Sequence, residues 1–136
     1  VTITFAKQDA VRVRLQEGRL AMTLSIARLT KPPRRWKNFQ VRAFYRPQAN
    51  GPSAELARDG IIQLIGPRLD LGSQIALRGI FTSTFAKERP WKLTPEAVAA
   101  NPKLADVAVT QFVVEDGWIG VALGPSRTAQ RPGVLR

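Results

Sequence analysis

The residues best suited to chemistry in this chain are basic side chains gathered around one tryptophan. Four of them surround Trp36 in a predicted loop that contains the proline pair Pro32–Pro33, and another follows on the next predicted strand. Arginine donates paired hydrogen bonds to phosphate, and an indole stacks on a base or lies at the level of lipid headgroups. We therefore predict an anion-binding site at Lys31, Arg34, Arg35, Trp36, Lys37 and Arg42. The alternative is a solvated basic loop whose tryptophan folds back over the sheet edge.

The charge of the whole chain supports a search for acidic partners. Its 136 residues include 21 Lys and Arg against 10 Asp and Glu, a formal net charge of +11. Between Ala10 and Ala54 there are ten basic residues and one acid, Glu17. Positive charge of this size favours nucleic acid, anionic lipid or an acidic protein. A basic surface that only keeps the protein in solution is the alternative.

Composition also argues against several kinds of catalysis. The chain contains no cysteine and no histidine, which excludes disulfides, thiolate chemistry and Ser-His-Asp or Cys-His arrangements. Most acids stand in predicted turns or at helix ends, as Glu17, Asp59 and Asp116 do before glycines. We predict that the protein is not an enzyme, with no metal site and no cofactor.

Alternating apolar and polar residues predict several β-strands that would carry the basic residues on one face. Val11–Leu15 and Phe39–Arg46 alternate in this way, and so does the run from Arg19 to Leu29. Acid-glycine pairs predict hairpin turns; they are Glu17–Gly18, Asp59–Gly60 and Asp116–Gly117. Proline and polar residues predict two loops, Thr30–Asn38 and Pro47–Ser53.

The periodicity changes to that of a helix at about Leu71–Ala86. We expect its apolar stripe at Leu71, Ile75, Ile80, Phe81 and Phe85. Thr94, Pro95 and Glu96 predict the start of a second, short helix with Thr94 as its N-cap. Residues of the first helix could line a lipid-holding groove against the sheet or form plain core.

Together these elements predict an α+β fold. We expect a twisted, mostly antiparallel sheet of six to eight strands packed on one long amphipathic helix, plus one short helix. Residues 1–125 would form a single domain, and residues 126–136 a flexible basic tail. No apolar run approaches the ~20 residues that cross a bilayer, so no transmembrane segment is expected.

The second half of the chain resembles a known family in its order of elements. An amphipathic helix is followed by a short proline-bounded helix and then by the hairpin Asp106–Gly124 with its Asp116–Gly117 turn. This order, over Ile61–Gly124, is similar to the C-terminal part of bacterial tubular lipid-binding-like proteins, and to the ends of bacterial proteins of planctomycete type. The resemblance implies a curved sheet around a helix, with lipid held in a groove lined by Leu71, Ile75, Phe81 and Phe85.

The function expected from these observations is non-enzymatic binding of a lipid, or of another amphipathic or anionic ligand, at the cell envelope or in the periplasm. A structural or protein-interaction domain is the first alternative, and a nucleic-acid-binding module the second. The expected partners are anionic lipid or an acidic protein, less so nucleic acid, and a homodimer is among the expected states.

Overall fold

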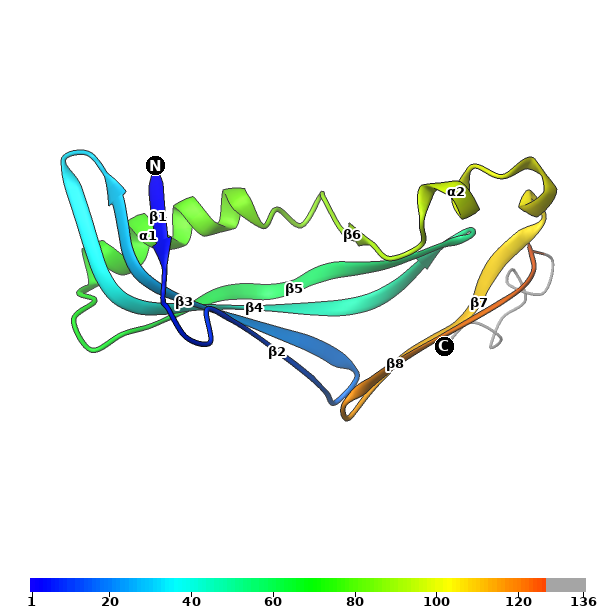
Figure 1. Cartoon of the computed structure of the whole chain (residues 1–136), viewed down its shortest axis with the longest axis horizontal. Coiled ribbons are helices and arrows are strands. Elements are labelled where there is room, and N and C mark those ends of the chain that lie inside the picture. Colours follow the sequence, from blue (N-terminus) through cyan, green and yellow to red (C-terminus); the bar gives the residue numbers. More distant parts are fainter. Residues whose placement is uncertain (127–136) are drawn as a thin grey trace. The chain divides into compact units, whose positions relative to one another are not determined.

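The fold is α+β, as predicted, with mostly antiparallel strands in a strongly curled sheet (Figure 1). The structure is a computed structural model that describes residues 1–126. All of the predicted tail except Ser126 therefore lies outside the described residues. The elements are β1 (Thr2–Phe5), β2 (Val11–Gln16), β3 (Arg19–Lys31), β4 (Arg34–Asn50), β5 (Ser53–Ile65), α1 (Leu71–Thr84), β6 (Trp91–Lys92), α2 (Glu96–Ala99), a 3-10 turn (Pro102–Leu104), β7 (Val107–Glu115) and β8 (Trp118–Pro125).

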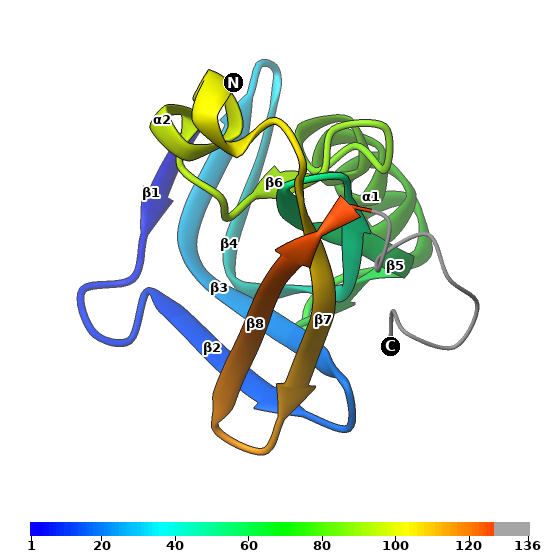
Figure 2. The same cartoon turned by 90° about the vertical axis from the view of Figure 1, so that its right-hand side faces the viewer.

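Within the described part of the chain, six strands form one sheet and two form another. The first sheet has the order β1-β3-β4-β5-β6, and β2 also pairs with β3. β1 runs antiparallel to β3, from the pair Thr2–Thr30 to the pair Phe5–Ile26. The second sheet is the antiparallel hairpin of β7 and β8, whose strands lie side by side in Figure 2.

Two of the three predicted hairpin turns are confirmed. Glu17 and Gly18, between β2 and β3, have φ values of 56° and 76°, and type I′ turns require positive φ at both positions. Asp116 and Gly117 join β7 to β8, with φ of 87° at the glycine. The third prediction, at Asp59–Gly60, is wrong. Gly60 adopts a φ of 73° inside β5, and the strand continues through it.

The two predicted loops are much shorter in the structure. The predicted loop Thr30–Asn38 is wrong, because β3 continues to Lys31 and β4 begins at Arg34. Only Pro32 and Pro33 form the turn between the two strands. Prolines are tolerated there because a turn needs no ladder hydrogen bond from them. Pro47–Ser53 is likewise strand except at Gly51 and Pro52, since β4 extends to Asn50.

α1 confirms the predicted long helix but buries a different stripe. Asp70 caps its N-terminus by accepting a hydrogen bond from the Ser73 backbone N–H at 2.7 Å. Its buried residues are Ser73, Leu77 and Phe81, spaced by four, and the Phe81 ring meets Phe39 of β4 edge-on at 6.4 Å. Of the predicted stripe, Phe81 is buried as expected, but the prediction is wrong at Leu71 and Ile75, because both side chains are exposed.

α2 confirms the predicted short helix but not its predicted cap. Pro95, with extended ψ, occupies the N-cap position and makes no side-chain cap hydrogen bond. The Thr94 hydroxyl instead donates to the Pro52 carbonyl at 3.1 Å and accepts from the Ala54 N–H at 2.8 Å. Thr94 therefore ties the segment before α2 to the β4–β5 turn.

The chain divides into two compact units, and each of the long strands β3, β4 and β5 contributes residues to both units. One unit contains residues 1–14, 21–44 and 59–86, and its core includes Ile26, Leu29, Val41, Ile62, Leu77 and Phe81. The other contains, of the described residues, 15–20, 45–58 and 87–126, and its core includes Tyr45, Leu56, Val109, Phe112 and Val114.

Candidate anion-binding site

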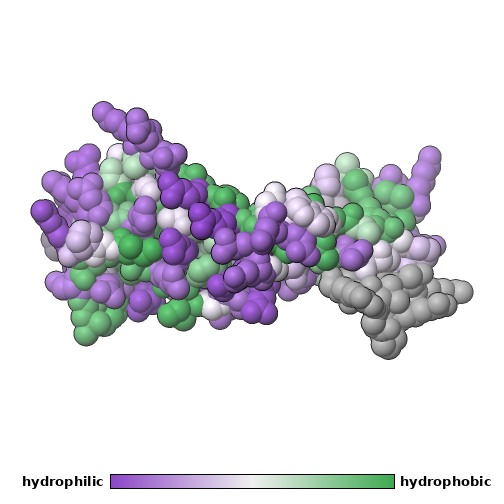
Figure 3. Space-filling model, turned by 90° about the horizontal axis from the view of Figure 1, so that it is seen from below, coloured by the Kyte–Doolittle hydropathy of each residue, from purple (hydrophilic) through white to green (hydrophobic). Residues whose placement is uncertain are grey.

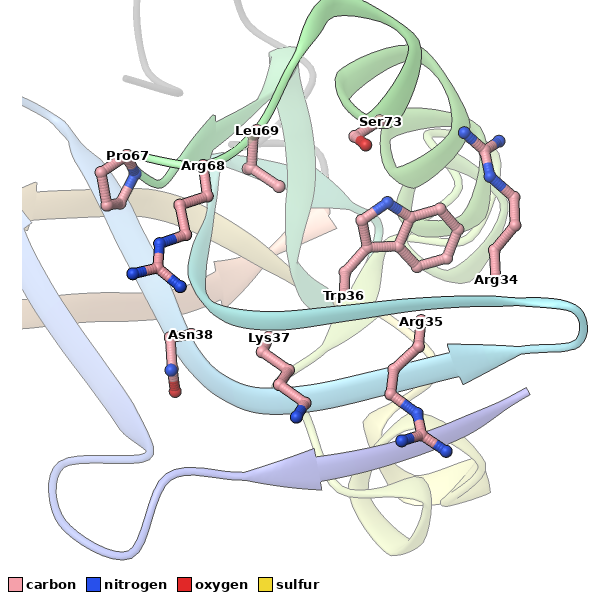
Figure 4. A pocket seen from close by; sticks show the side chains of 9 residues that line it. All are labelled: Arg34, Arg35, Trp36, Lys37, Asn38, Pro67, Arg68, Leu69 and Ser73. Atoms are coloured by element: carbon pink, nitrogen blue, oxygen red, sulfur yellow. The ribbon is translucent and has the colours of Figure 1, made fainter.

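The first unit contains a hollow with a strongly basic lining, which we call the basic pocket. Its volume is about 710 Å³, and its lining includes no acidic side chain. β4 provides one wall, and the segment from β5 into α1 provides the other (Figure 4). The lining residues are Arg34, Arg35, Trp36, Lys37, Asn38, Pro67, Arg68, Leu69 and Ser73.

The first residues of β4 position this lining through normal strand alternation. Figure 4 shows Arg34 and the Trp36 ring directed toward α1, where Ser73 lies, whereas Arg35 and Lys37 project from the other side of the strand. Trp36 is thereby buried, and the basic side chains are spread around the pocket rather than converging on one point.

A local irregularity at Asn38 brings Trp36 and Phe39 to the same face of β4. Both side chains are buried although their spacing of three would place them on opposite faces of a regular strand. Asn38 has a φ of 52°, and a residue in this left-handed conformation shifts the phase of a strand in the manner of a β-bulge. The basic pocket lies on the N-terminal side of this shift.

Arg34 is the most constrained cation of the pocket. Its guanidinium carbon lies 5.1 Å from the centroid of the Trp36 ring, a distance at which a cation is attracted by the ring face. The backbone N–H and the hydroxyl of Ser73 lower the pKa of Asp70 below its usual value, and the charge of Arg34 lowers it further. Asp70 thus offsets part of the charge of Arg34.

The other three cations carry uncompensated charge. Arg35, Lys37 and Arg68 form no ion pair within residues 1–126. All three are exposed at the rim. They can therefore donate to an anion without first giving up an acidic partner, and hydrogen bonds between ionised groups are the stronger kind.

An apolar hollow of about 380 Å³ adjoins the basic pocket, and the two share Asn38 and Pro67. The rest of its wall comes from Ala6 just after β1, from β3, and from the Phe39 and Ile65 region. We call it the apolar hollow; it is lined by Ala6, Ser25, Ile26, Ala27, Asn38, Phe39, Gln40, Ile65, Gly66 and Pro67. Volumes of this size fall within the ~300–1,000 Å³ of small-molecule sites.

The structure gathers four of the six predicted anion-binding residues and separates two. Arg34, Arg35, Trp36 and Lys37 line the basic pocket. Lys31 lines another hollow, of about 600 Å³, with Val1, Ile3 and Ile75. Arg42 donates from Nε to the Thr23 hydroxyl across the sheet at 3.2 Å. Arg68 was missed because it stands alone in a loop, and only folding brings that loop beside β4.

The residues predicted to line a groove under the helix do not share one surface. Phe81 is fully buried in the core, and Phe85 is half-buried with its ring stacked on Phe81 at 6.3 Å. Leu71 and Ile75 are exposed, and of the four only Ile75 reaches a described hollow. The space between α1 and β4 is occupied by side chains such as Leu77, Phe81 and Phe39.

Within the described residues, no group of three or more acidic residues is placed to hold a metal ion, and no helix is long and apolar enough to cross a membrane. Comparison of the chain with family models, curated proteins and solved structures found no match.

Proposed function

We propose that this protein is a non-enzymatic binding domain for an anionic amphiphile, a molecule in which a phosphate or carboxylate is joined to an apolar chain. The observation that carries the proposal is that the basic pocket and the apolar hollow are neighbours with two lining residues in common, Asn38 and Pro67. One ligand can occupy both hollows only if it is anionic at one end and apolar at the other. Such molecules are most abundant at the cell envelope, which is the setting we favour.

The chemistry of the two hollows supports a division of roles. Arg35, Lys37 and Arg68 would donate hydrogen bonds to the anionic head, as they have no acidic partner among residues 1–126 to give up. The apolar end would lie against Ala27, Phe39 and Ile65 and remove apolar surface from water. Trp36, close to the head, would report binding through its fluorescence.

The test compares three ligands that separate head from tail. Binding is measured by titration calorimetry with lysophosphatidic acid, lysophosphatidylcholine and glycerol phosphate, each below any micelle-forming concentration. We expect lysophosphatidic acid to bind at least about tenfold more tightly than the other two, because it alone joins an apolar chain to a head of net negative charge. The choline of lysophosphatidylcholine balances the charge of its phosphate, glycerol phosphate has no chain, and a charged hydrogen bond contributes ~1.5–3 kcal/mol. Equal binding of all three ligands, or binding of none, would contradict the proposal.

Matched variants locate the binding. Arg35→Gln with Arg68→Gln removes two charges from the basic pocket, and Arg14→Gln with Arg28→Gln removes two exposed charges elsewhere. Only the first pair of substitutions should lower the affinity for lysophosphatidic acid by about tenfold or more. Ala27→Leu narrows the apolar hollow. It should lower the affinity for lysophosphatidic acid and leave the affinity for glycerol phosphate unchanged.

Nucleic acid is the competing ligand, because the same basic residues could bind its phosphates. Its binding would fall steeply with salt and would weaken comparably in both pairs of charge variants, because phosphate contacts along a backbone are spread over many cations. That outcome, together with weak binding of lysophosphatidic acid, would assign the basic residues to nucleic acid instead.

A further inference from the structure

The hairpin of β7 and β8 leaves one strand edge without a partner. Within residues 1–126, β8 pairs only with β7, and the sheet they form has only these two strands. β8 carries no charged residue from Trp118 to Pro125, and proline stands only at its end. Natural edge strands are protected by charges, prolines or a covering element, and an isolated two-stranded sheet is marginal in water.

The apolar face of this hairpin extends across the unpaired strand. Val109, Phe112 and Val114 of β7 are buried, and their partners on β8 are Leu123, Val121 and Ile119. Directly paired residues share a face of the sheet. The three side chains on β8 are nevertheless 50 %, 47 % and 36 % exposed, in the same order. In Figure 3 hydrophobic residues reach the surface at the end that holds α2, β7 and β8 in Figure 1.

The backbone groups of the same three residues point to the open edge. Glu115 and Trp118 close the two-residue turn, and the closing pair of such a turn exchanges hydrogen bonds. Hydrogen-bonded and non-hydrogen-bonded pairs then alternate along an antiparallel ladder. Ile119, Val121 and Leu123 therefore direct their N–H and C=O groups away from β7, while their side chains continue the apolar face.

We propose that β8 pairs with β8 of a second copy of this chain, antiparallel about a two-fold axis at Val121. Antiparallel pairing centred there places Val121 opposite Val121 and Ile119 opposite Leu123. The outward backbone groups of one copy then meet those of the other, and the two apolar rows form one surface. The open backbone groups of each strand are thus satisfied by a copy of itself, and the apolar row continues from one copy to the next.

β8 is an edge at which two copies can meet without placing like charges opposite each other, because the strand carries no charged residue. Each copy carries a formal charge of +11, so most surfaces of two copies repel each other. The segment from Leu93 to Gly124 holds four acids and one base, Lys103. The proposed register also keeps the acids of the two turns apart, because Asp116 lies across from Ser126 of the second copy.

The first experiment measures the mass of the full chain by sedimentation equilibrium over a range of concentrations. The chain of 15.0 kDa should sediment as a dimer. Val121→Lys places two like charges opposite each other at the axis and should weaken the dimer at least about tenfold. Leu71→Lys adds the same charge at a more exposed site and should leave the dimer intact. A monomeric wild type, or a Val121→Lys dimer of unchanged affinity, would overturn the proposal.

The second experiment places the axis. The chain has no cysteine, so Val121→Cys and Leu71→Cys each carry a single thiol. Opposite residues of a hydrogen-bonded pair have Cα atoms about 5.5 Å apart, within reach of a short bifunctional maleimide. Covalent dimer should form efficiently with Val121→Cys and poorly with Leu71→Cys. Equal yields would mean that the copies do not meet at β8, and would exclude the proposed register.

Discussion

The indole ring of Trp91 stacks on the ring of Tyr45, with centroids 4.2 Å apart and planes 23° from parallel. Trp91 pairs through β6 with the β5 residue Leu56, and Tyr45 belongs to β4, so the stack links two segments of the same unit. Tyr45 is 2 % exposed, and its hydroxyl has no hydrogen-bond partner within the described residues. Burial therefore governs the chemistry of this phenol.

Tyr45 should titrate well above an ordinary tyrosine. Burial raises its pKa to about 12, against a partial opposing effect of the nearby Arg58 charge. The chain contains one tyrosine, so the ultraviolet absorbance of tyrosinate reports this group alone. The native protein should titrate near pH 12, and the denatured protein near 10. A native titration near pH 10 would show that the phenol reaches water.

The same shift predicts how stability changes at alkaline pH. Because the folded state holds the phenol proton more tightly than the unfolded state, this contribution is complete below pH 10 and is lost as the pH rises toward 12. Tyr45→Phe keeps the stacked ring but cannot ionise. Its free energy of unfolding, measured with urea, should fall less than that of the wild type between pH 10 and 12. Parallel curves would contradict the prediction.

Arg58 should be replaceable with a gain in stability. Its Nε and Nη1 atoms are buried without a hydrogen-bond partner in the described part of the chain. An unsatisfied buried donor costs ~1–3 kcal/mol, so Arg58→Met should raise the free energy of unfolding by about 1 kcal/mol or more. The pKa of Tyr45 should rise further without this charge. Arg14→Met, at an exposed position, should change stability by less than ~0.5 kcal/mol. A loss of stability in Arg58→Met would point to a partner for this guanidinium.

Local signals in the sequence predicted the turns and helices that short-range chemistry decides. Glu17–Gly18 and Asp116–Gly117 form turns because the glycines supply a positive φ at no steric cost. The long helix begins at Leu71 as predicted. Four of the predicted site residues also lie together, because Arg34–Lys37 are neighbours in the chain and line one pocket.

The sequence could not predict features that depend on distant parts of the chain. Left-handed residues at Asn38 and Gly60 continue strands that composition alone would end, because the pairing of neighbouring strands maintains them. Arg68 joins the basic pocket only when its loop meets β4. The buried side of α1 was ambiguous, because apolar residues occur both at Leu71 and Ile75 and at Leu77 and Phe81.

The two sides of α1 should respond differently to the same truncation. Leu77 is fully buried, whereas Leu71 is 72 % exposed. Leu77→Ala removes packed methyl groups and should lower the free energy of unfolding by ~2–5 kcal/mol. Leu71→Ala should change it by less than ~0.5 kcal/mol. Urea unfolding followed by circular dichroism measures both variants. Equal losses would mean that Leu71 also packs against a partner.

Asp70 should make the stability of the protein sensitive to acid. The hydrogen bond from Ser73 N–H lowers the pKa of this carboxyl below its usual value, so the ionised form stabilises the fold. This contribution is present above the ordinary pKa of 3.8 and is lost as the pH falls through the lowered folded-state pKa.

Asp70→Ala loses the cap of α1 and should melt at a lower temperature at neutral pH. Asp70→Asn keeps an acceptor for Ser73 without the titrating charge. Its melting temperature should therefore change less than that of the wild type as the pH is lowered. Identical acid profiles for the wild type and Asp70→Asn would show that other carboxyls govern the acid response.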